Sequence, residues 1–502
     1  MVYFSLILSV SLSSIFYVFS QPPHNLSPLS FIFILPLHII SQGMKKKNAF
    51  FLWFLSGFLT WVGMMHWLRT SINIAELPSI TSLTAITFLA LLLGFFWGIF
   101  GLLRGIIPYP SLIRDPILWV CLEYIRGFFF PWGFVGYSLW KAIPIIQIAD
   151  ITGIYGISFF IILICGFLCD IWDYRDRKKF ILLESFLILF ITSLISSYGL
   201  FRITHLRKED GKRVNVLLIN TEIPQVLKWR EKYEFFERYI MLTLNGLNGC
   251  REKGIDVELV VWPETALTFL YQEERELSKR LFDIVSERNI KLLTGGIRKE
   301  GYRGRLFVYN TAFLITPSFY EFYDKLLLVP FGEYTPFRNI LNAIPIVKGI
   351  FQRIEQVYAE TTRGREEKIF SIGDKSFSTP ICWEAIFPWF VRRFVKDGAN
   401  FIVNISNDAW FEGTSAIEQH FVYSIMRAVE NRVYFLRSSN MGIGGVISPL
   451  GEVIESTKEE GHLLTSITLK NIHSFYSSYG DIFSQSLILL LIVMIWKGKK
   501  NR

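Results

Sequence analysis

The sequence predicts two parts, a membrane all-α part and an α/β domain outside the cytoplasm, on three observations. First, 51% of the 502 residues are hydrophobic and only 19% are charged, a balance typical of membrane proteins. Second, residues 1–201 are dense in apolar runs, whereas residues 202–479 read as globular sequence. Third, one more apolar run lies near the C-terminus. We therefore expect a transmembrane domain at 1–201, a globular domain at 202–479, and a transmembrane helix with a basic cytoplasmic tail at 480–502.

Eight apolar runs approach the roughly 20 residues that a helix needs to cross a bilayer. The segment Met1-Val2-Tyr3 lacks a positive start and no small-residue cleavage site follows it, so we interpret the first run as a membrane helix rather than a signal peptide. In chain order the runs are Tyr3–Ser20, Leu26–Ile40, Ala49–Leu68, Ile80–Leu103, Ile117–Leu139, Gly153–Cys169, Phe180–Phe201 and Ile482–Trp496.

The short loops predict the orientation, because cytoplasmic loops of membrane proteins are enriched in lysine and arginine. The loops after the second, fourth and sixth runs are basic, and so is the tail, whereas the other short loops carry little beyond Arg69 and Lys141. With a cytoplasmic N-terminus, all the basic clusters are cytoplasmic and the globular domain, inserted between helices 7 and 8, is extracytoplasmic. The clusters contain Lys45, Lys46, Lys47, Arg104, Arg114, Arg175, Arg177, Lys178, Lys179, Lys497, Lys499, Lys500 and Arg502.

Two charged residues, Glu123 and Arg126, lie inside the fifth apolar run. Charges at membrane depth are expensive and are usually paired. Their i, i+3 spacing places both on one face of a helix, so we expect an ion pair. It serves either as a structural pair near the interface or as a group near a lipid headgroup.

The globular part alternates strand-like and helix-like segments, which is typical of an α/β domain. The strand-like segments are Val214–Asn220, Val257–Trp262, Lys291–Gly296, Phe307–Thr316, Phe319–Tyr323, Ser376–Ile381, Phe401–Ser406, Tyr434–Ser438 and Gly444–Ile447. The helix-like segments are Glu274–Arg288, Phe387–Lys396 and Ile417–Asn431, and Pro449-Leu450-Gly451 predicts a turn.

Three residues of the globular part have the chemistry of a nucleophilic site. Cys382 ends a strand-like run just before a helix, where a nucleophile is exposed and the following N–H groups point toward its target. Glu264 follows a strand-like run and is a candidate base for the thiol. Lys325 also follows a strand, and it is a cation that can stabilise an oxyanion together with the Trp383 N–H. Taken singly, these residues also fit a buried cysteine, a surface glutamate and a surface lysine.

In combination, the motifs around these residues resemble those of the nitrilase superfamily, which uses a Glu–Lys–Cys triad in this chain order. That resemblance implies an αββα sandwich. The matching motifs are Trp262-Pro263-Glu264, Lys325 followed by Pro330-Phe331-Gly332-Glu333-Tyr334-Thr335-Pro336, Cys382-Trp383-Glu384, Ser406-Asn407-Asp408-Ala409-Trp410-Phe411, Gln419-His420, Arg427-Ala428-Val429-Glu430 and Arg437-Ser438-Ser439-Asn440.

The apolar runs narrow the resemblance to the apolipoprotein N-acyltransferase family. This family also has several N-terminal spans, a nitrilase-like extracytoplasmic domain and one closing span. The membrane motifs that match are Glu123-x-x-Arg126-Gly127, Phe130-Pro131-Trp132 and Gly136-Tyr137-Ser138. Two positions depart from the family pattern: Trp383 stands where tyrosine is common, and Glu412 interrupts a Trp-Phe-Gly run.

The resemblance assigns roles to individual residues. Glu264 would be the general base, Cys382 the nucleophile and Lys325 the stabiliser of the transition state. Glu333 and Glu384 match supporting carboxylates, and Trp229 matches a tryptophan near the substrate entrance, although packing roles fit these three as well. The segment Ile340–Phe351 is apolar and is either a core helix or a mobile arm that admits lipid.

The implied reaction is acyl transfer in the bacterial inner membrane, with the catalytic domain on the periplasmic side. The donor would be a phospholipid such as phosphatidylethanolamine, and the acceptor the α-amino group of the diacylglyceryl-cysteine of an apolipoprotein. We expect no cofactor and no metal, because the cysteines and histidines fit no ligand spacing. The net charge of +9 comes without a nucleic-acid motif, so we expect no nucleic acid partner. The alternatives are a membrane-bound nitrilase-type amidase or hydrolase that uses water, and a transporter or receptor.

Overall fold

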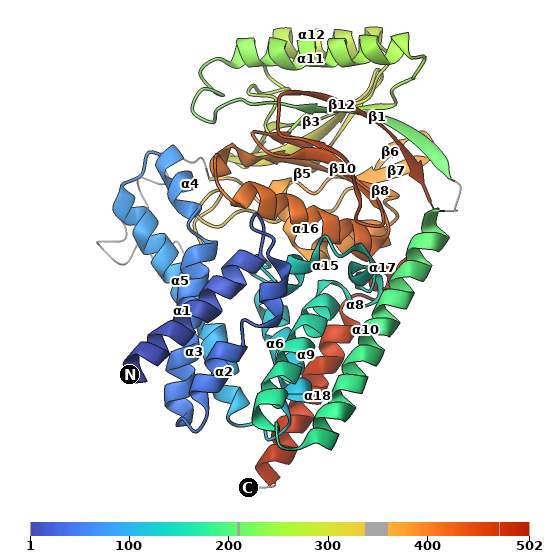
Figure 1. Ribbon diagram of the computed structural model, residues 1–502. Coiled ribbons are helices and arrows are strands. Elements are labelled where there is room, and N and C mark those ends of the chain that lie inside the picture. The colour runs from blue at the N-terminus through green and yellow to red at the C-terminus, as the bar shows by residue number, and fades with distance from the viewer. Residues whose placement is uncertain (1, 208–210, 337–359, 471, 501–502) are drawn as a thin grey trace.

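The molecule consists of a helical bundle with an α/β sandwich seated on one end (Figure 1). The computed structural model describes residues 2–207, 211–336, 360–470 and 472–500. The expected arm Ile340–Phe351 lies outside these residues. Both termini lie at the end of the bundle that is remote from the sandwich (Figure 1).

The bundle is built from apolar helices whose outer side chains are exposed. On α10 (Lys178–Arg207), for example, Leu182, Phe186 and Leu189 are each 68% exposed, which is typical of a lipid-facing surface. Among the described residues, four helices are long and apolar enough to cross a membrane, or five if one bent pair forms a single span. The longer bundle helices are α1 (Val2–Ser20), α3 (Lys46–Met64), α5 (Ser79–Arg104), α6 (Ser111–Gly127), α9 (Ile154–Asp173), α10 (Lys178–Arg207) and α18 (Ile482–Lys500).

Two expected spans are broken. The run Leu26–Ile40 forms a 3-10 turn, Ser27–Phe31, and the short helix α2 (Leu35–Ser41), because Pro28 and Pro36 each lack the N–H that a continuous helix requires. The run Ala49–Leu68 divides into α3 and α4 (Leu68–Ile74), which are bent by 46°. The short helices α7 (Ile143–Ile146) and α8 (Ala149–Thr152) follow later in the bundle.

The expected helix Ile117–Leu139 is also wrong in its second half, because α6 ends at Gly127. Residues 128–134 form a loop, which we call the aromatic loop, and a 3-10 turn follows at Val135–Leu139. Within the loop, Pro131 has no N–H to donate, and Gly133 has a φ of 56°, which a right-handed helix does not accommodate. This loop lies where the bundle contacts the sandwich.

The expected ion pair between Glu123 and Arg126 is wrong, since no ion pair joins them within the described part of the chain. The Glu123 carboxylate accepts from the Val135 N–H at 2.9 Å. The Arg126 guanidinium donates to the carbonyl oxygens of Phe130 at 2.9 Å and Trp132 at 2.5 Å. Arg126 therefore holds the backbone of the aromatic loop, and Glu123 holds the first N–H of the 3-10 turn that follows it, where buried backbone groups lack helical partners.

The sandwich contains two six-stranded sheets between two layers of helices, so the expected αββα arrangement is confirmed. One sheet has the order β12-β1-β2-β3-β4-β5 and the other β11-β10-β9-β8-β7-β6. The strands are β1 (Lys212–Asn220), β2 (Leu259–Val261), β3 (Leu292–Tyr302), β4 (Arg305–Ile315), β5 (Tyr320–Asp324), β6 (Phe370–Ile372), β7 (Lys375–Ser378), β8 (Phe401–Asn407), β9 (Tyr434–Asn440), β10 (Gly444–Ile447), β11 (Val453–Thr457) and β12 (Gly461–Leu469).

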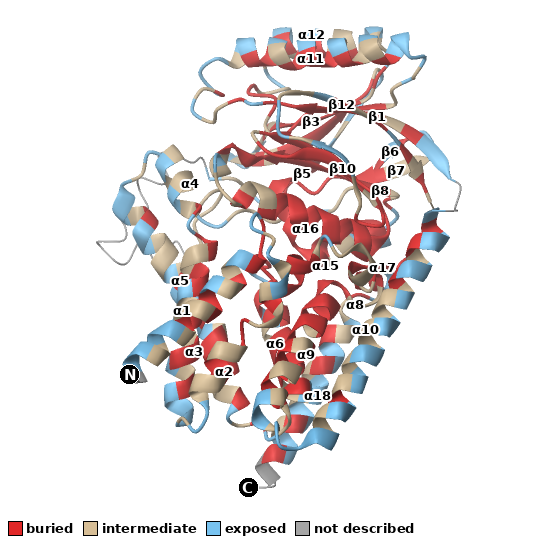
Figure 2. Ribbon diagram, viewed as in Figure 1, coloured by how far each residue is buried: buried red, intermediate tan, exposed pale blue. Residues whose placement is uncertain are grey.

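Two helical layers enclose the sheets. Helices α11 (Lys232–Glu252) and α12 (Arg275–Glu287) cover the outer sheet, while α15 (Pro388–Lys396) and α16 (Ala416–Asn431) lie between the second sheet and the bundle (Figure 1). Helix α16 is almost entirely buried (Figure 2), as expected for a helix that packs on both sides. The short helix α17 (Phe475–Tyr479) leads into α18.

Parallel strands occupy the middle of each sheet: β1, β2 and β3 in one, β7, β8 and β9 in the other. Parallel strands buried on both faces read as continuous apolar runs, which is why Leu259–Val261 and Phe401–Asn407 could be recognised in the sequence. The carboxyl ends of such strands gather residues at one edge, where α/β sites form.

Candidate active site

The three residues expected to react follow the ends of three strands. Glu264 comes after β2, Lys325 directly after β5, and Cys382 after β7. Cys382 begins a 3-10 turn, Cys382–Ile386, that leads to α15, and its φ of 49° lies in the left-handed region. The side chains are buried, with 5% of Glu264, 1% of Lys325 and 8% of Cys382 exposed.

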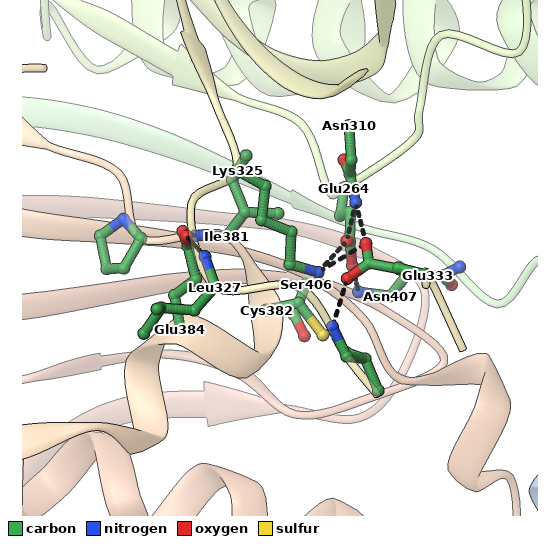
Figure 3. Close-up of polar contacts among 12 residues, drawn as sticks. Glu264, Asn310, Lys325, Leu327, Glu333, Ile381, Cys382, Glu384, Ser406 and Asn407 are labelled. Atoms are coloured by element: carbon green, nitrogen blue, oxygen red, sulfur yellow. Dashed lines mark hydrogen bonds and ion pairs between the residues drawn. The ribbon is translucent and has the colours of Figure 1, made fainter. Parts of the chain in front are cut away.

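The Lys325 ammonium lies between two carboxylates (Figure 3). Its Nζ is 3.2 Å from Oε1 of Glu264 and 3.0 Å from Oε1 of Glu333. Burial by itself lowers the pKa of Lys325, but the two negative charges outweigh burial and raise the pKa well above its usual value. The lysine is therefore a permanent cation at this site.

Glu264 is fixed by donors on both carboxylate oxygens. Oε1 accepts from Nδ2 of Asn310 at 2.7 Å, and Oε2 accepts from the Asn407 N–H at 2.9 Å (Figure 3). The same Asn310 amide donates to Oε1 of Glu333 at 2.8 Å, so one asparagine aligns both carboxylates. A fully engaged carboxylate has one orientation, as a positioned base requires.

Burial and nearby charges change the pKa of the Cys382 thiol in opposite directions. Burial raises its pKa to about 12, the negative charge of Glu264 adds to the increase, and the positive charge of Lys325 opposes it. The thiol is therefore protonated in the resting state near neutral pH. A nucleophilic thiolate requires transfer of the proton to a base, and Glu264 is the carboxylate with the largest electrostatic effect on the thiol.

Glu384 ties the turn of Cys382 to the loop of Lys325. Its carboxylate accepts from the N–H groups of Ile381 at 2.7 Å, Leu326 at 2.6 Å and Leu327 at 2.9 Å, and from the Tyr323 hydroxyl at 2.9 Å. Burial raises the pKa of Glu384 to about 7, although the N–H donors favour the charged form. This residue has no exposed surface, so its carboxylate contacts the protein's own backbone and the Tyr323 hydroxyl rather than solvent.

A second buried polar group lies beside the thiol. The Cys382 sulfur, an oxygen of Asp408 and a ring nitrogen of His420 lie within 4.8 Å of one another. Such residues can hold a metal ion, but Arg437 donates to Asp408 at 2.6 Å and lies 3.0 Å from Nδ1 of His420. Since this guanidinium places a positive charge where a cation would bind, we assign no metal here.

The two expected tryptophans lie in different surroundings. Trp383 is only 7% exposed, and it stacks on Trp132 of the aromatic loop with ring centroids 6.1 Å apart. Trp229 is 46% exposed, while its neighbour Lys228 is fully buried and donates to the Glu264 carbonyl at 3.1 Å. Burial lowers the pKa of Lys228 to about 8.

Sequence reasoning gave no individual role to Asn310, Asn407, Asp408, His420 or Lys228. Asn407, Asp408 and His420 lie in motifs that resemble those of the nitrilase superfamily, and Asp408 directly follows the buried strand β8, the position where site residues gather. Asn310 and Lys228 carry no local signal that separates them from ordinary polar residues of an α/β domain.

Comparisons with known proteins cover nearly the whole chain. The family model for the apolipoprotein N-acyltransferase N-terminal domain matches residues 13–167, and the carbon-nitrogen hydrolase model matches residues 226–476. An apolipoprotein N-acyltransferase of Geobacter metallireducens is 32% identical over 95% of this chain and 92% of the relative. That of Haemophilus influenzae is 27% identical over 98% of this chain and 94% of the relative.

Among solved structures, an amidase of the nitrilase superfamily from Nesterenkonia is similar to part of the chain, with a TM-score of 0.39, 17% identity, and coverage of 56% of this chain and 96% of that chain. The match to the first family model lies in the apolar bundle, and the match to the second lies in the sandwich and includes Cys382. The relatives align with both parts. The chain belongs to the apolipoprotein N-acyltransferase family.

Proposed function

We propose that this membrane-associated acyltransferase, which acts on apolipoproteins, works through an acyl thioester on Cys382. The observation that carries the proposal is the convergence of the Cys382 thiol, the Glu264 carboxylate and the Lys325 ammonium at one buried edge of the sandwich. A protonated thiol beside a fixed carboxylate is the starting arrangement for nucleophilic catalysis by general base assistance.

In the first half-reaction, Glu264 takes the proton of the Cys382 thiol while the sulfur attacks an ester carbonyl of the donor. Lys325 and the Trp383 N–H stabilise the oxyanion that forms. The C–O bond breaks, Glu264 returns its proton to the departing oxygen, and a lysolipid leaves. Glu333 and Glu384 support this step by holding Lys325 and the turn of Cys382.

In the second half-reaction, the amine of the acceptor attacks the thioester. Glu264 removes the proton of the amine, the C–S bond breaks, and the thiolate regains a proton. The product is an amide on the α-amino group of the diacylglyceryl-cysteine. The two half-reactions form a ping-pong scheme, in which donor and acceptor use the same nucleophile in turn.

The donor in this proposal is a phospholipid such as phosphatidylethanolamine. The support is the position of the site: the aromatic loop of the bundle reaches Trp383, next to the nucleophile, and Phe130 of that loop lies 6.0 Å from the Trp383 ring. An apolar contact from the membrane part is suited to an acyl chain. Trp229, which is half exposed, would lie at the entrance.

We also propose that the chain crosses the inner membrane eight times and that the sandwich lies on the periplasmic side. The transmembrane domain then comprises residues 1–201, the catalytic domain 202–479, and the last helix with its tail 480–502. The distribution of basic residues supports this orientation. Helices α6 and α18 run beside the longer helices of the bundle (Figure 1), although each is shorter or less apolar than a standard span. Along the chain, the sandwich is inserted between α10 and the two last helices, α17 and α18.

The decisive experiment is intact-protein mass spectrometry of the purified full chain after incubation with a phospholipid and no acceptor. We expect a hydroxylamine-labile acyl adduct that is absent in Cys382→Ala and is discharged by a diacylated lipopeptide with formation of an amide. Discharge by water at the same rate with and without the lipopeptide would favour a hydrolase. Absence of an adduct with every phospholipid tried would overturn the thioester.

A further inference from the structure

The ring of His420 contacts the backbone of the nucleophile. Nε2 of His420 lies 3.3 Å from the carbonyl oxygen of Cys382, and Nδ2 of Asn404 lies 3.4 Å from the same oxygen. Since a carbonyl only accepts, Nε2 carries a proton directed at it. With the proton on Nε2, Nδ1 accepts from the Arg437 guanidinium at 3.0 Å, and Arg437 also donates to the neighbouring Asp408 carboxylate. The ring is therefore held between Arg437 and the carbonyl of Cys382.

This carbonyl belongs to the same peptide group as the N–H of Trp383. A peptide group is planar and trans, so fixing the direction of the oxygen also fixes the direction of the N–H on its opposite side. The constraint matters here because Cys382 has a φ of 49°, a conformation that a non-glycine residue keeps only when its surroundings enforce it. His420 and Asn404 supply that enforcement.

The residue before His420 is held by the membrane part. Oε1 of Gln419 accepts from Nε1 of Trp132 at 2.7 Å, and Nε2 of Gln419 donates to the Pro22 carbonyl at 3.0 Å. One turn later, the Tyr423 hydroxyl accepts from the Gly133 N–H at 3.0 Å. Gln419 is 2% exposed and Trp132 fully buried, so these bonds are shielded from water.

We propose that the aromatic loop of the membrane part positions the oxyanion donor of the active site, acting through Gln419 and His420 on the peptide that joins Cys382 to Trp383. His420 is a positioning residue in this inference, and Trp132 acts one step further away. The inference rests on the proposed thioester chemistry, in which the Trp383 N–H stabilises the oxyanion. Its consequence is that the bundle is a structural part of the catalytic site as well as an anchor.

The test compares two reactions of Cys382 in the full chain in detergent. Acylation by p-nitrophenyl butyrate passes through an oxyanion and needs no lipid entry, whereas alkylation by iodoacetamide has no oxyanion. We expect His420→Leu to lower the rate constant for acylation about a hundredfold at unchanged KM, because one oxyanion donor is misdirected. Alkylation should stay within about threefold of wild type, since the thiol itself is unchanged.

Conservative replacements and a matched control sharpen the test. His420→Gln keeps an N–H that reaches the carbonyl, so acylation should recover to within about tenfold of wild type. Trp132→Phe keeps the ring but removes the bond to Gln419, and should lower acylation about tenfold. Trp140→Phe removes a comparable indole bond, to Asn25 at 2.7 Å in the same part of the bundle, and should change nothing.

Coupling between the two positions is tested with the double variant. If Trp132 acts through His420, adding Trp132→Phe to His420→Leu should lower acylation no further. The inference is overturned if Trp132→Phe acylates like Trp140→Phe, or if alkylation and acylation fall together. An absence of acylation and adduct in the wild type would instead overturn the thioester, and this inference with it.

Discussion

At the scale of single residues, the site combines a nucleophile that resists ionisation with a base whose carboxylate is held by Asn310, the Asn407 N–H and Lys325. Burial raises the pKa of the Cys382 thiol to about 12, and Glu264 contributes to that increase. Lys325 opposes it and remains cationic between Glu264 and Glu333. Such an arrangement keeps a reactive thiolate from forming until the proton is transferred, which protects the thiol from oxidation and alkylation.

Replacing the base should separate ionisation of the thiol from turnover. In Glu264→Gln, acyl transfer should fall about 10²- to 10⁴-fold, because general base assistance is lost. The pKa of Cys382 should fall, because a negative charge that raises it has been removed. Thiolate-dependent alkylation by iodoacetamide should therefore be faster than in the wild type at each pH below the pKa of the thiol. The measurements are turnover of a phospholipid donor and alkylation rates from pH 6 to 11.

The matched control for this prediction is Glu287→Gln, which removes an exposed carboxylate from α12 on the outer face of the sandwich. Both measurements should be unchanged there. Alkylation of Glu264→Gln that is as slow as, or slower than, that of the wild type across this pH range would refute the electrostatic account.

Glu384 should act on stability as well as on activity. The Glu384 carboxylate accepts from several N–H groups, among them those of Ile381 and Leu326. In Glu384→Gln one carboxylate oxygen becomes an amide NH2, which is a donor and therefore cannot accept from them. A buried donor left without an acceptor costs about 1–3 kcal/mol. Thermal unfolding of the full chain in detergent should therefore show a lower midpoint than the wild type. A variant with unchanged midpoint and unchanged turnover would exclude the supporting role.

At the scale of elements, close packing of β3 against the Glu264 segment limits which residue β3 can have at position 295. A Cβ added at Gly295 would lie 2.5 Å from the Thr265 nitrogen and 2.6 Å from the Glu264 Cα, and both are backbone atoms that cannot rotate away. The Glu264 segment is additionally constrained, because Thr265 has a φ of 53°. Glycine is therefore required at 295 by the approach of two backbones.

Gly295→Ala should lower turnover about a hundredfold, because a displacement of Glu264 by about an ångström breaks its alignment with the thiol. Gly301→Ala on the same strand is the control, since its new Cβ would meet no atom within 4 Å. Both proteins should be assayed for phospholipid-dependent adduct formation. Equal activity in the two variants would show that the Glu264 segment moves freely.

At the scale of the whole molecule, the sandwich rests on the bundle through α16 and the aromatic loop (Figure 1). Buried ion pairs also cross this boundary, since Arg432 after α16 pairs with Asp150 of α8 at 2.8 Å. Asp150 also pairs with Arg202 of α10 at 2.9 Å. These buried polar contacts join the two parts, and much of their stabilising free energy is lost if one part moves relative to the other.

The proposed orientation can be tested by labelling. All five described cysteines are buried, so labelling of the wild type in cells should be weak. A cysteine introduced as Lys279→Cys on α12, where the side chain is 79% exposed, should react with a membrane-impermeant maleimide once the outer membrane is permeabilised. Arg175→Cys, between α9 and α10, should react only after the inner membrane is disrupted. The reverse pattern would place the sandwich in the cytoplasm.

The sequence by itself determined the two-part architecture, strands β1 to β5 and β7 to β10, and the chain order of the residues with catalytic chemistry, whereas β6, β11 and β12 were not predicted. Hydropathy, strand-like runs and turn residues are local properties, so they predicted β1, β8 and α16 closely, as well as the placement of Cys382 at a strand-to-helix turn. The catalytic roles of Glu264, Lys325 and Cys382 stay predictions, although the structure brings the three together.

Tertiary structure decided where each polar group finds its partner. The i, i+3 spacing of Glu123 and Arg126 indicated an ion pair. Instead, Arg126 binds carbonyls of the aromatic loop and Glu123 binds the first N–H of the turn after it, because these backbone groups have no helical hydrogen-bond partners. The link from Trp132 to Gln419 joins residues 287 positions apart in the chain. No local pattern encodes such a contact, since it exists only once the sandwich and the bundle have packed together.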